Sequence, residues 1–508
     1  MSSRLPQRLS RLSLERLRGM RRGVEKESLR VLPGNGLALT PHPVALGSAL
    51  THPSITTDFS ESQLELITGV HASADGCERE LIELHQFVYR AIGEERLWVA
   101  SMPCTLPADE NIPIGTYGTS NIGRAKSVYR MGLGHRYGRR MQTISGIHYN
   151  WSLPGLSNKE YFALIRNFRR HSFLLLLLFG ASPAVSSSFV EGRPHELLPL
   201  GEGGSTMYLP YATSLRMGRL GYQSDAQAAL AVSYNSLESY AGSLHGALTR
   251  PHPPYERLGV CNLGGEYNQL ATSLLQIENE FYGTIRPKRV IRPGERPLHA
   301  LRERGVEYVE VRCMDLDPFE PVGINAQTMR FLDIFLLHCL LTDSPPDDPV
   351  EIVRLGQNQH RTAARGREPG LALDAEDGPV LLLSWAERLL AECEPVAARV
   401  AAALDDERYP AALQSARALL HAPAELPSTR VLRAMHEDYG DSYVAFVQAR
   451  AQETRLQLLT LPYPPALQAR YEQLAHASLA EQQAAEAADT VPFETFRQQY
   501  LAPERLVA

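Results

Sequence analysis

The sequence lacks the features that mark several large classes of protein. Its longest uninterrupted hydrophobic run covers residues 173–179, far short of the ~20 residues that a membrane-spanning helix needs. The formal net charge is −6, whereas nucleic-acid-binding proteins usually carry a basic excess. We therefore expect a protein that neither spans a membrane nor binds nucleic acid.

Cysteine is scarce and dispersed. The six cysteines contain no Cys-x-x-Cys pair, which argues against a structural zinc site and is typical of reduced thiols in a cytoplasmic protein. A signal peptide is not indicated either, because the first 22 residues hold seven arginines and no continuous apolar core. We expect a cytoplasmic protein whose N-terminus is a basic amphipathic helix packed on the body. A membrane-surface or targeting role for that helix is the alternative.

A phosphate-binding loop of the Walker type is also missing. Residues 118–126 have the first glycine spacing but lack the Gly-Lys-Ser/Thr ending. Residues 201–204 are glycine-rich but short and acidic. A bound nucleotide would therefore have to be held by metal ions and arginines.

Two carboxylates stand two positions apart in the strand-like segment 23–31. Because side chains alternate between the faces of a strand, Glu25 and Glu27 point the same way. The apolar Leu29 and Val31 share their face. Paired carboxylates repel each other and are costly to bury, so they normally need a compensating cation. No basic residue lies on that face, which favours a hard metal ion such as Mg²⁺. The alternative is a Glu-x-Glu pair on an exposed strand edge.

Three further strand-like segments place polar side chains on one face and apolar ones on the other. Glu65 lies in the first, His148 and Asn150 share a face of the second, and Glu310 and Arg312 share a face of the third. Alone, such a glutamate is usually solvated and such a histidine is usually structural. If the four segments lie in one sheet, their polar face is a cavity lined with oxygen ligands and a few cations.

This combination of side chains suits one class of reaction. Carboxylate oxygens suit Mg²⁺ or Mn²⁺. Arginines, including those of the basic cluster 286–289, suit phosphate recognition, although such a cluster is most often a surface loop. The pattern indicates metal-dependent phosphoryl transfer from a nucleotide. A metal-dependent phosphohydrolase and a non-catalytic nucleotide or amino-acid sensor are the alternatives.

The pattern divides the chain into three regions. Residues 1–342 mix strand-like and helical segments without regular βαβ spacing, which predicts an α+β catalytic unit with a mainly antiparallel sheet. Residues 343–379 are expected to be an irregular connecting segment, and 380–508 a helical C-terminal region packed on the catalytic unit. The expected strands are 23–31, 63–69, 142–152 and 305–315, and the expected helices are 77–93, 158–178, 224–248 and 326–341.

Several segments together resemble the glutamate–cysteine ligase family, in its gamma-proteobacterial form. The resemblance spans nearly the whole chain in order and is weak only between about 343 and 480. The segments that carry it are 23–30, 45–52, 55–59, 141–150, 179–184, 209–216, 285–289 and 487–490.

The resemblance implies a curved, mainly antiparallel sheet with outer helices, similar to the fold of glutamine synthetase. It implies metal ligands at Glu25, Glu27, Asp58, Glu65, His148 and Glu310. It implies that Gln142, Ile144 and Arg216 bind L-glutamate and that Phe59, Tyr129, Tyr222 and Tyr282 form the L-cysteine pocket. Arg312 and Asn150 match groups near the transferred phosphoryl of ATP. On charge alone we add Arg286 and Lys288 as phosphate candidates.

The implied reaction joins two amino acids at the expense of ATP. ATP phosphorylates the γ-carboxylate of glutamate, and the amino group of cysteine then displaces phosphate, giving γ-glutamylcysteine, ADP and phosphate in the first step of glutathione biosynthesis. Mg²⁺ is the implied cofactor, with Mn²⁺ as the alternative, and glutathione is the implied feedback inhibitor. A size-based acceptor pocket discriminates by only ~1–3 kcal/mol per methylene, so a γ-glutamyl ligase with another amine acceptor stays open.

Overall fold

The computed structural model describes residues 4–506, apart from 222–226, 228–229 and 293. Within these residues the central element is a seven-stranded sheet in which every pairing is antiparallel. Its order is β2-β3-β1-β5-β10-β9, and β4 pairs with β1 off this path. The strands are β1 (Arg21–Val31), β2 (Ile55–Thr57), β3 (Gln63–Ile67), β4 (Arg96–Leu97), β5 (Ile147–Ser152), β9 (Ile285–Lys288) and β10 (Tyr308–Met314). The expected α+β class is confirmed.

The sequence predicted the long strands of the sheet better than the short ones. The expected strands 23–31, 63–69 and 305–315 correspond to β1, β3 and β10. The expected strand 142–152 is too long, because Met141–Thr143 form the 3-10 helix η3 and pairing starts at Ile147. Strands β2, β4 and β9 are too short to show a period-two pattern, and β9 contains a proline, which an edge strand tolerates.

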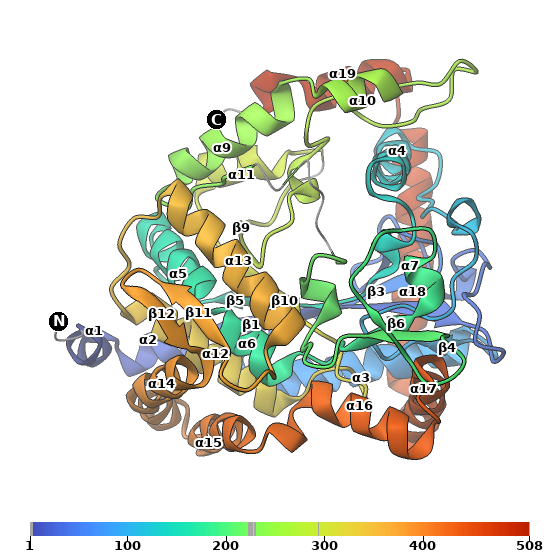
Figure 1. Cartoon of the computed structure of the whole chain (residues 1–508). Helices are drawn as coiled ribbons and strands as arrows, with labels where there is room; N and C mark the ends of the chain where they lie inside the picture. Colours follow the sequence, from blue (N-terminus) through green and yellow to red (C-terminus); the bar gives the residue numbers. More distant parts are fainter. Residues whose placement is uncertain (1–3, 222–226, 228–229, 293, 507–508) are drawn as a thin grey trace.

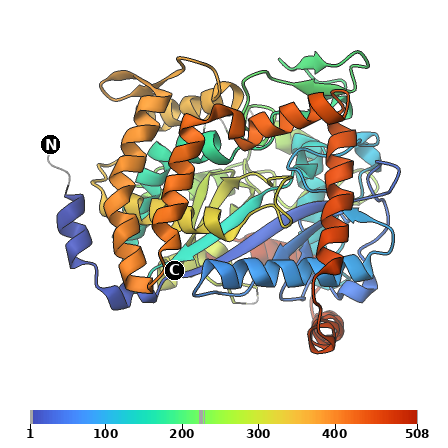
Figure 2. The same cartoon turned by 90° about the horizontal axis from the view of Figure 1, so that it is seen from below.

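Helices cover one face of the sheet and bury its apolar side chains. Val24, Leu66 and Tyr149 belong to the same core as the helices below them. Figure 1 shows most of these helices beneath the strands, with α5 beside them, and Figure 2 shows the molecule from below. They include α3 (Ala74–Ala91), α5 (Asn158–His171), α6 (Phe173–Phe179), α12 (Ala326–Leu341), α14 (Leu382–Leu404), α15 (Arg408–His421), α16 (Pro427–Asp438) and α17 (Tyr443–Thr460).

Polar caps explain where several of these helices begin. The side chain of Ser73 accepts from Gly76 N and starts α3 three residues earlier than expected. Ser157 and Glu160 form a capping box at α5. The expected helix 158–178 is divided at Ser172 into α5 and α6. Of the expected helix 224–248, part lies outside the described residues, and α9 (Leu237–Thr249) begins after the Ser236 cap.

The N-terminus forms two short helices packed on the body, α1 (Leu5–Arg11) and α2 (Leu14–Arg18). Leu5, Leu9 and Leu17 are buried against the core. Arg8 donates to the carbonyls of Leu341 (3.2 Å) and Thr342 (2.7 Å) at the end of α12, where a cation compensates the helix dipole. The arginine-rich start of the chain is thus a packing element.

Segment 343–379, expected to be irregular, is largely regular. It contains α13 (Pro349–Arg365), and the hairpin of β11 (Ala372–Ala375) and β12 (Gly378–Leu381) begins within it. The Asp348 side chain caps α13 and Pro349 occupies its first turn, a start signal that the glycine- and arginine-rich composition obscured. After Leu382 the chain is helical, as expected, and continues through α18 (Pro465–Ala487) and α19 (Phe493–Leu501). The division into three regions stays a prediction.

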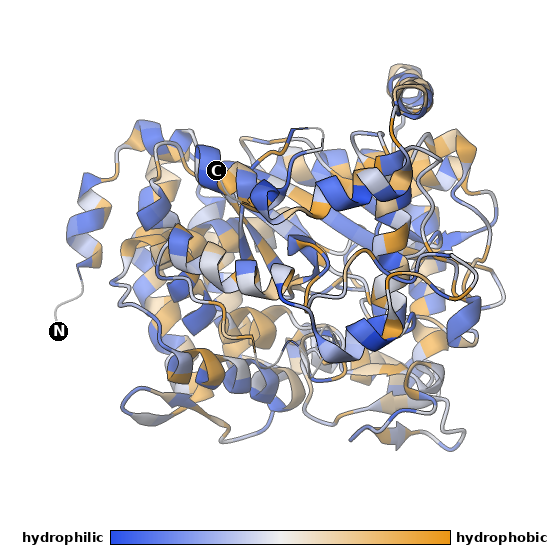
Figure 3. Cartoon of the chain, turned by 90° about the horizontal axis from the view of Figure 1, so that it is seen from above, coloured by the Kyte–Doolittle hydropathy of each residue, from blue (hydrophilic) through white to orange (hydrophobic). Residues whose placement is uncertain are grey.

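Further helices surround the other face of the sheet. Figure 1 shows α4 (Asn121–Tyr137) on one side, α9 and α11 (Pro297–Arg304) on the other, and α10 (Pro253–Leu258) with α19 across the top. A small sheet of β6 (Ala184–Ser186), β8 (Thr206–Tyr208) and β7 (Leu198–Leu200) lies beside α7 (Ser187–Val190). Hydrophilic and hydrophobic residues alternate along the outer helices (Figure 3). Within the described part of the chain, none of the helices combines the length and apolar character needed to cross a membrane.

Candidate active site

Four neighbouring strands bring the expected polar residues onto the uncovered face of the sheet. In the register of β1, Glu27 stands opposite Glu65 of β3 and Glu25 stands opposite His148 of β5. Across β5 and β10, Asn150 stands opposite Glu310. Side chains of directly paired residues lie on the same face within reach of each other. The sequence prediction that these segments share one polar face is therefore confirmed.

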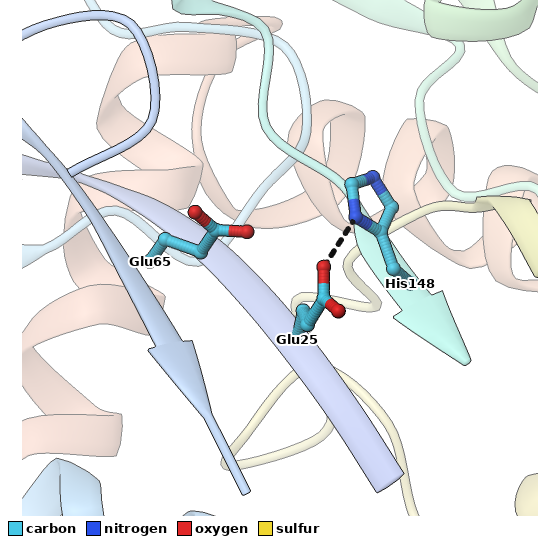
Figure 4. Close-up of side chains that lie close together, drawn as sticks. All are labelled: Glu25, Glu65 and His148. Atoms are coloured by element: carbon cyan, nitrogen blue, oxygen red, sulfur yellow. Dashed lines mark hydrogen bonds and ion pairs between the residues drawn. The ribbon is translucent and has the colours of Figure 1, made fainter. Parts of the chain in front are cut away.

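Glu25, Glu65 and His148 form the tightest ligand cluster of the site. One ligand atom from each lies within 4.8 Å of the others. Figure 4 shows the two carboxylates and the imidazole converging from three adjacent strands. His148 Nδ1 lies 3.1 Å from Glu25 Oε2 and its Nε2 lies 3.6 Å from Glu27 Oε1. Two carboxylates and one imidazole are a donor set that fits Mg²⁺ or Mn²⁺.

The side of the site near β2 and β3, which we call the acid end, comprises Glu27, Asp58 and Glu65. Burial and the nearby Asp58 raise the pKa of Glu27 to about 8, although Arg216 and Arg312 oppose them. Burial and the charges of Glu25 and Asp58 hold the pKa of Glu65 well above its usual range. Carboxylates that resist ionisation in this way are stabilised by a bound cation. The acid end therefore fits a metal ion.

The side near β9 and β10, the cationic end, comprises Glu310, Lys288 and Arg312. Lys288 Nζ lies 2.9 Å from Glu310 Oε1 and Arg312 NH1 lies 3.0 Å from Glu310 Oε2. These two cations outweigh burial and hold the pKa of Glu310 well below its usual range. Glu310, expected as a metal ligand, thus already has charge partners within the protein.

Two polar atoms at this end are available to a ligand. Asn150 donates to Glu25 Oε1 (3.0 Å), while its buried Oδ1 has no hydrogen-bond partner among the described residues. Arg286 donates to the carbonyls of Phe281 and Asn279, while its buried Nε has no acceptor within the described part of the chain. Buried polar atoms are rarely left unsatisfied, so both suit contacts to a bound molecule.

Arg216, the expected glutamate ligand, lies at the centre of the site. It belongs to the 3-10 helix η4 (Leu215–Met217), is buried, and donates to the carbonyl of Arg312 (2.8 Å). A side chain at Gly146 would overlap its guanidinium, so this close approach requires glycine. A pocket extends from Arg216 and Arg312 to Tyr282 and Gln359. Two guanidinium groups facing one pocket suit an anionic substrate.

The expected acceptor residues gather beside this pocket. Gln142 Nε2 donates to the Tyr282 hydroxyl (3.1 Å), which joins the predicted glutamate and cysteine sets. Phe59, Tyr129 and Ile144 belong to the same apolar cluster as Tyr282. Tyr222, the remaining expected pocket residue, lies outside the described residues.

Three contributors to the site were missed from the sequence. Arg130 of α4 donates to the backbone carbonyl of Asp58 and stacks on the Tyr117 ring, 4.4 Å from its centroid. Gln359 of α13 lines the pocket and donates to Met217 O (3.2 Å). Asp315 lies 3.9 Å from Arg216. Arg130 and Gln359 lie on helices, where strand alternation gives no signal, and neither helix was expected.

Comparisons with known proteins agree with this geometry. The family model described as glutamate-cysteine ligase matches residues 7–362. The glutamate–cysteine ligase of Pseudomonas aeruginosa is 48% identical over 499 residues, which cover 94% of each chain. That of Alcanivorax borkumensis is 45% identical over 506 residues, covering 95% of this chain and 96% of its own.

Solved structures give the same result. The crystal structure of glutamate–cysteine ligase from Francisella tularensis in complex with AMP matches with a TM-score of 0.90 and 36% identity, covering 96% of this chain and 98% of that one. A bifunctional glutathione synthetase from Pasteurella multocida matches with a TM-score of 0.70 and 26% identity, covering 93% of this chain and 58% of that one. The chain belongs to the glutamate–cysteine ligase family.

Proposed function

We infer that this protein joins the γ-carboxylate of L-glutamate to the amino group of L-cysteine, using ATP, in the first step of glutathione biosynthesis. The observation that carries the inference is the match to glutamate–cysteine ligases over almost the entire chain. The site agrees, because it combines a carboxylate–imidazole cluster with two buried arginines at one pocket. Those are the groups that phosphoryl transfer to a carboxylate requires.

We propose that Glu25, Glu27, Asp58, Glu65, His148 and Glu310 hold Mg²⁺. When bound, the ion neutralises the phosphates of ATP. The raised pKa values of Glu27 and Glu65 support this, since a cation relieves the repulsion between them. Mn²⁺ satisfies the same oxygen ligands.

The protein's own cations have separate tasks in the proposed mechanism. Arg216 binds the α-carboxylate of glutamate, which leaves its γ-carboxylate directed toward Arg312. Arg312 offsets the charge of the phosphoryl group as it moves to that carboxylate, with Asn150 beside it. Lys288 and Arg286, on the same side, contact the phosphates of the nucleotide.

The acceptor then completes the reaction. The amine of cysteine attacks the acyl phosphate, a tetrahedral intermediate forms, and phosphate leaves with the bonding electrons. Tyr129, Tyr282 and Phe59 surround the small thiol side chain, and Tyr222 is the further pocket residue that the family resemblance implies. No side chain of the protein needs to form a covalent bond, and the six cysteines are all unbridged, with only Cys261 exposed. Free thiols are consistent with the cytoplasmic location that we propose. We also propose glutathione as a feedback inhibitor.

One incubation tests the function. The full-length protein is mixed with ATP, Mg²⁺ and glutamate, with and without cysteine, and the products are identified by mass. We expect γ-glutamylcysteine and an equal amount of ADP only when all components are present. ADP without an amide product would indicate a phosphohydrolase, and binding without turnover would indicate a sensor. Repeating the assay with 2-aminobutyrate and alanine measures acceptor selectivity, and repeating it with glutathione tests inhibition.

A further inference from the structure

A buried ion pair lies behind the acceptor pocket and joins its two walls. Arg136, at the end of α4, places NH1 2.8 Å from Oε1 of Glu280, and both side chains are 0% exposed. Glu280 ends the 3-10 helix η5 (Glu278–Glu280). Removing two charges from water costs about as much as their attraction returns, so such a pair contributes little to stability by itself. The role of the pair is therefore to hold the residues that it connects in fixed positions.

Both partners make further hydrogen bonds that connect α4 with segment 269–280. Glu280 accepts from the Tyr137 hydroxyl (2.6 Å) through Oε1 and from Gln276 N (2.6 Å) through Oε2. Arg136 donates to Gln269 Oε1 (2.8 Å) and to the carbonyl of Ala271 (2.6 Å). It also stacks on the Tyr255 ring at 4.0 Å. The pair therefore fixes segment 269–280 against α4.

The same network reaches Tyr282. The Tyr137 ring meets the Tyr282 ring edge-on, with 6.0 Å between the centroids. Gln227 donates to the Tyr137 hydroxyl (3.0 Å) and accepts from Tyr282 N (3.3 Å). At its other end, the Tyr282 hydroxyl contacts Gln142. Both the ring and the backbone of Tyr282 are thus held by groups that Glu280 positions.

We propose that Glu280, with Arg136 and Tyr137, is a positioning element that sets Tyr282 and thereby determines affinity and selectivity for the acceptor amino acid. The proposal rests on the assignment of Tyr282 to the acceptor pocket. Glu280 acts through Tyr282, so its loss should disturb the contacts of the acceptor more than those of glutamate, which Tyr282 reaches only through Gln142. A displacement of about 1 Å at a substrate contact is enough to change rates by as much as ~10²-fold.

Two variants test the proposal, one with a small change and one with a larger change to the network. Tyr137→Phe removes one hydroxyl and keeps the ring, while Glu280→Gln removes the charge and keeps the size. We expect both to raise the KM for cysteine, roughly tenfold for Glu280→Gln and less for Tyr137→Phe, within the range for misplaced contacts. The preference for cysteine over 2-aminobutyrate should fall, while the KM for glutamate and the KM for ATP should change less than the KM for cysteine.

Glu278→Gln is the matched control. Glu278 lies two residues away in the same 3-10 helix and forms a buried ion pair with Arg296 (2.7 Å), which faces Tyr500 of α19. It makes none of the contacts to Tyr137 or Gln227. If breaking any buried pair in this segment is sufficient, Glu278→Gln will raise the cysteine KM equally, and the proposal is wrong. Thermal melts of each variant show which proteins remain folded, and Tyr137→Phe serves if Glu280→Gln does not fold.

Tyr282→Phe separates this inference from the pocket assignment on which it rests. If Tyr282→Phe raises the cysteine KM but the Tyr137 and Glu280 variants do not, only the positioning role is overturned. If Tyr282→Phe leaves the cysteine KM unchanged, the pocket assignment fails and the inference fails with it. In both cases the wild-type reaction, measured by dipeptide formation, stands on its own.

Discussion

The cationic end and the acid end of the site differ in how the charges of their buried carboxylates are compensated. At the cationic end, Lys288 and Arg312 stabilise the charge of Glu310 and hold its pKa well below the usual range. At the acid end, burial and mutual repulsion raise the pKa of Glu27 to about 8. Among the described residues, no lysine or arginine forms an ion pair with Glu65 or Asp58. The carboxylate at the cationic end is thus charge-compensated within the protein, whereas the carboxylates at the acid end fit a bound cation.

Glu65→Gln should have the largest effect, because it removes a carboxylate from the end that we propose binds the metal ion. We expect dipeptide formation to slow roughly 10²–10³-fold, as for the loss of one preorganised charge contact. The rise in Tm produced by Mg²⁺ should shrink as well. Glu481→Gln, at an exposed position of α18, is the control. A Glu65→Gln variant with wild-type rate and metal response would remove Glu65 from the metal ligands.

Arg312→Lys should come second and should act at the cationic end. Lysine keeps the charge but loses the planar fork that contacts Glu310 and lies 3.4 Å from His148. We expect kcat to fall roughly 10²-fold, with a smaller change in the KM for glutamate, in steady-state assays. If KM rises and kcat does not fall, Arg312 binds the ground state and not the moving phosphoryl group.

Lys288→Met should have a smaller effect at the same end. It removes one of the two cations next to Glu310, and Arg312 remains. We expect a roughly tenfold loss of kcat/KM, typical for the partner of a ligand residue. Lys159→Met, at the exposed start of α5, should leave the rate unchanged. Equal rates for the two variants would show that Arg312 alone stabilises Glu310.

The smallest expected effect is a change in the stability of the metal-free protein with pH. The pKa of Glu27 is about 8 in the folded chain against an ordinary 4.5, so between these values the folded state holds a proton that the unfolded state has released. Metal-free stability should therefore decrease as the pH rises from 4.5 through about 8. Saturating Mg²⁺ should oppose this decrease, because it binds the ionised form. Melting curves at several pH values, with Mg²⁺ and with chelator, check this. A wild-type curve that Mg²⁺ does not change would contradict the metal assignment of the acid end.

Strand alternation made most of the carboxylate–imidazole cluster predictable from sequence. Glu25, Glu27 and Glu65 could be placed on one face because β1 and β3 are long enough to show period two. Arg130 and Gln359 could not, because they reach the site from helices whose packing direction depends on the whole fold. Segment 343–379 was misjudged because its arginine- and glycine-rich composition concealed a helix whose start depends on Asp348 and Pro349. The Arg136–Glu280 pair joins residues 144 positions apart, a distance that no local pattern spans.

The alternation of acidic and basic side chains along β1 also disfavours pairing of this strand in a wrong register. Lys26, between the two acids, points to the other face, where its Nζ lies 2.8 Å from His85 Nε2 of α3. A slip of one residue along β5 would place Glu25 and Glu27 in the apolar core and bring Lys26 among the remaining carboxylates. Because a one-residue shift exchanges the two faces of a strand, the misaligned sheet would bury two uncompensated charges. The charges needed for the reaction therefore also select the correct register before any substrate is present.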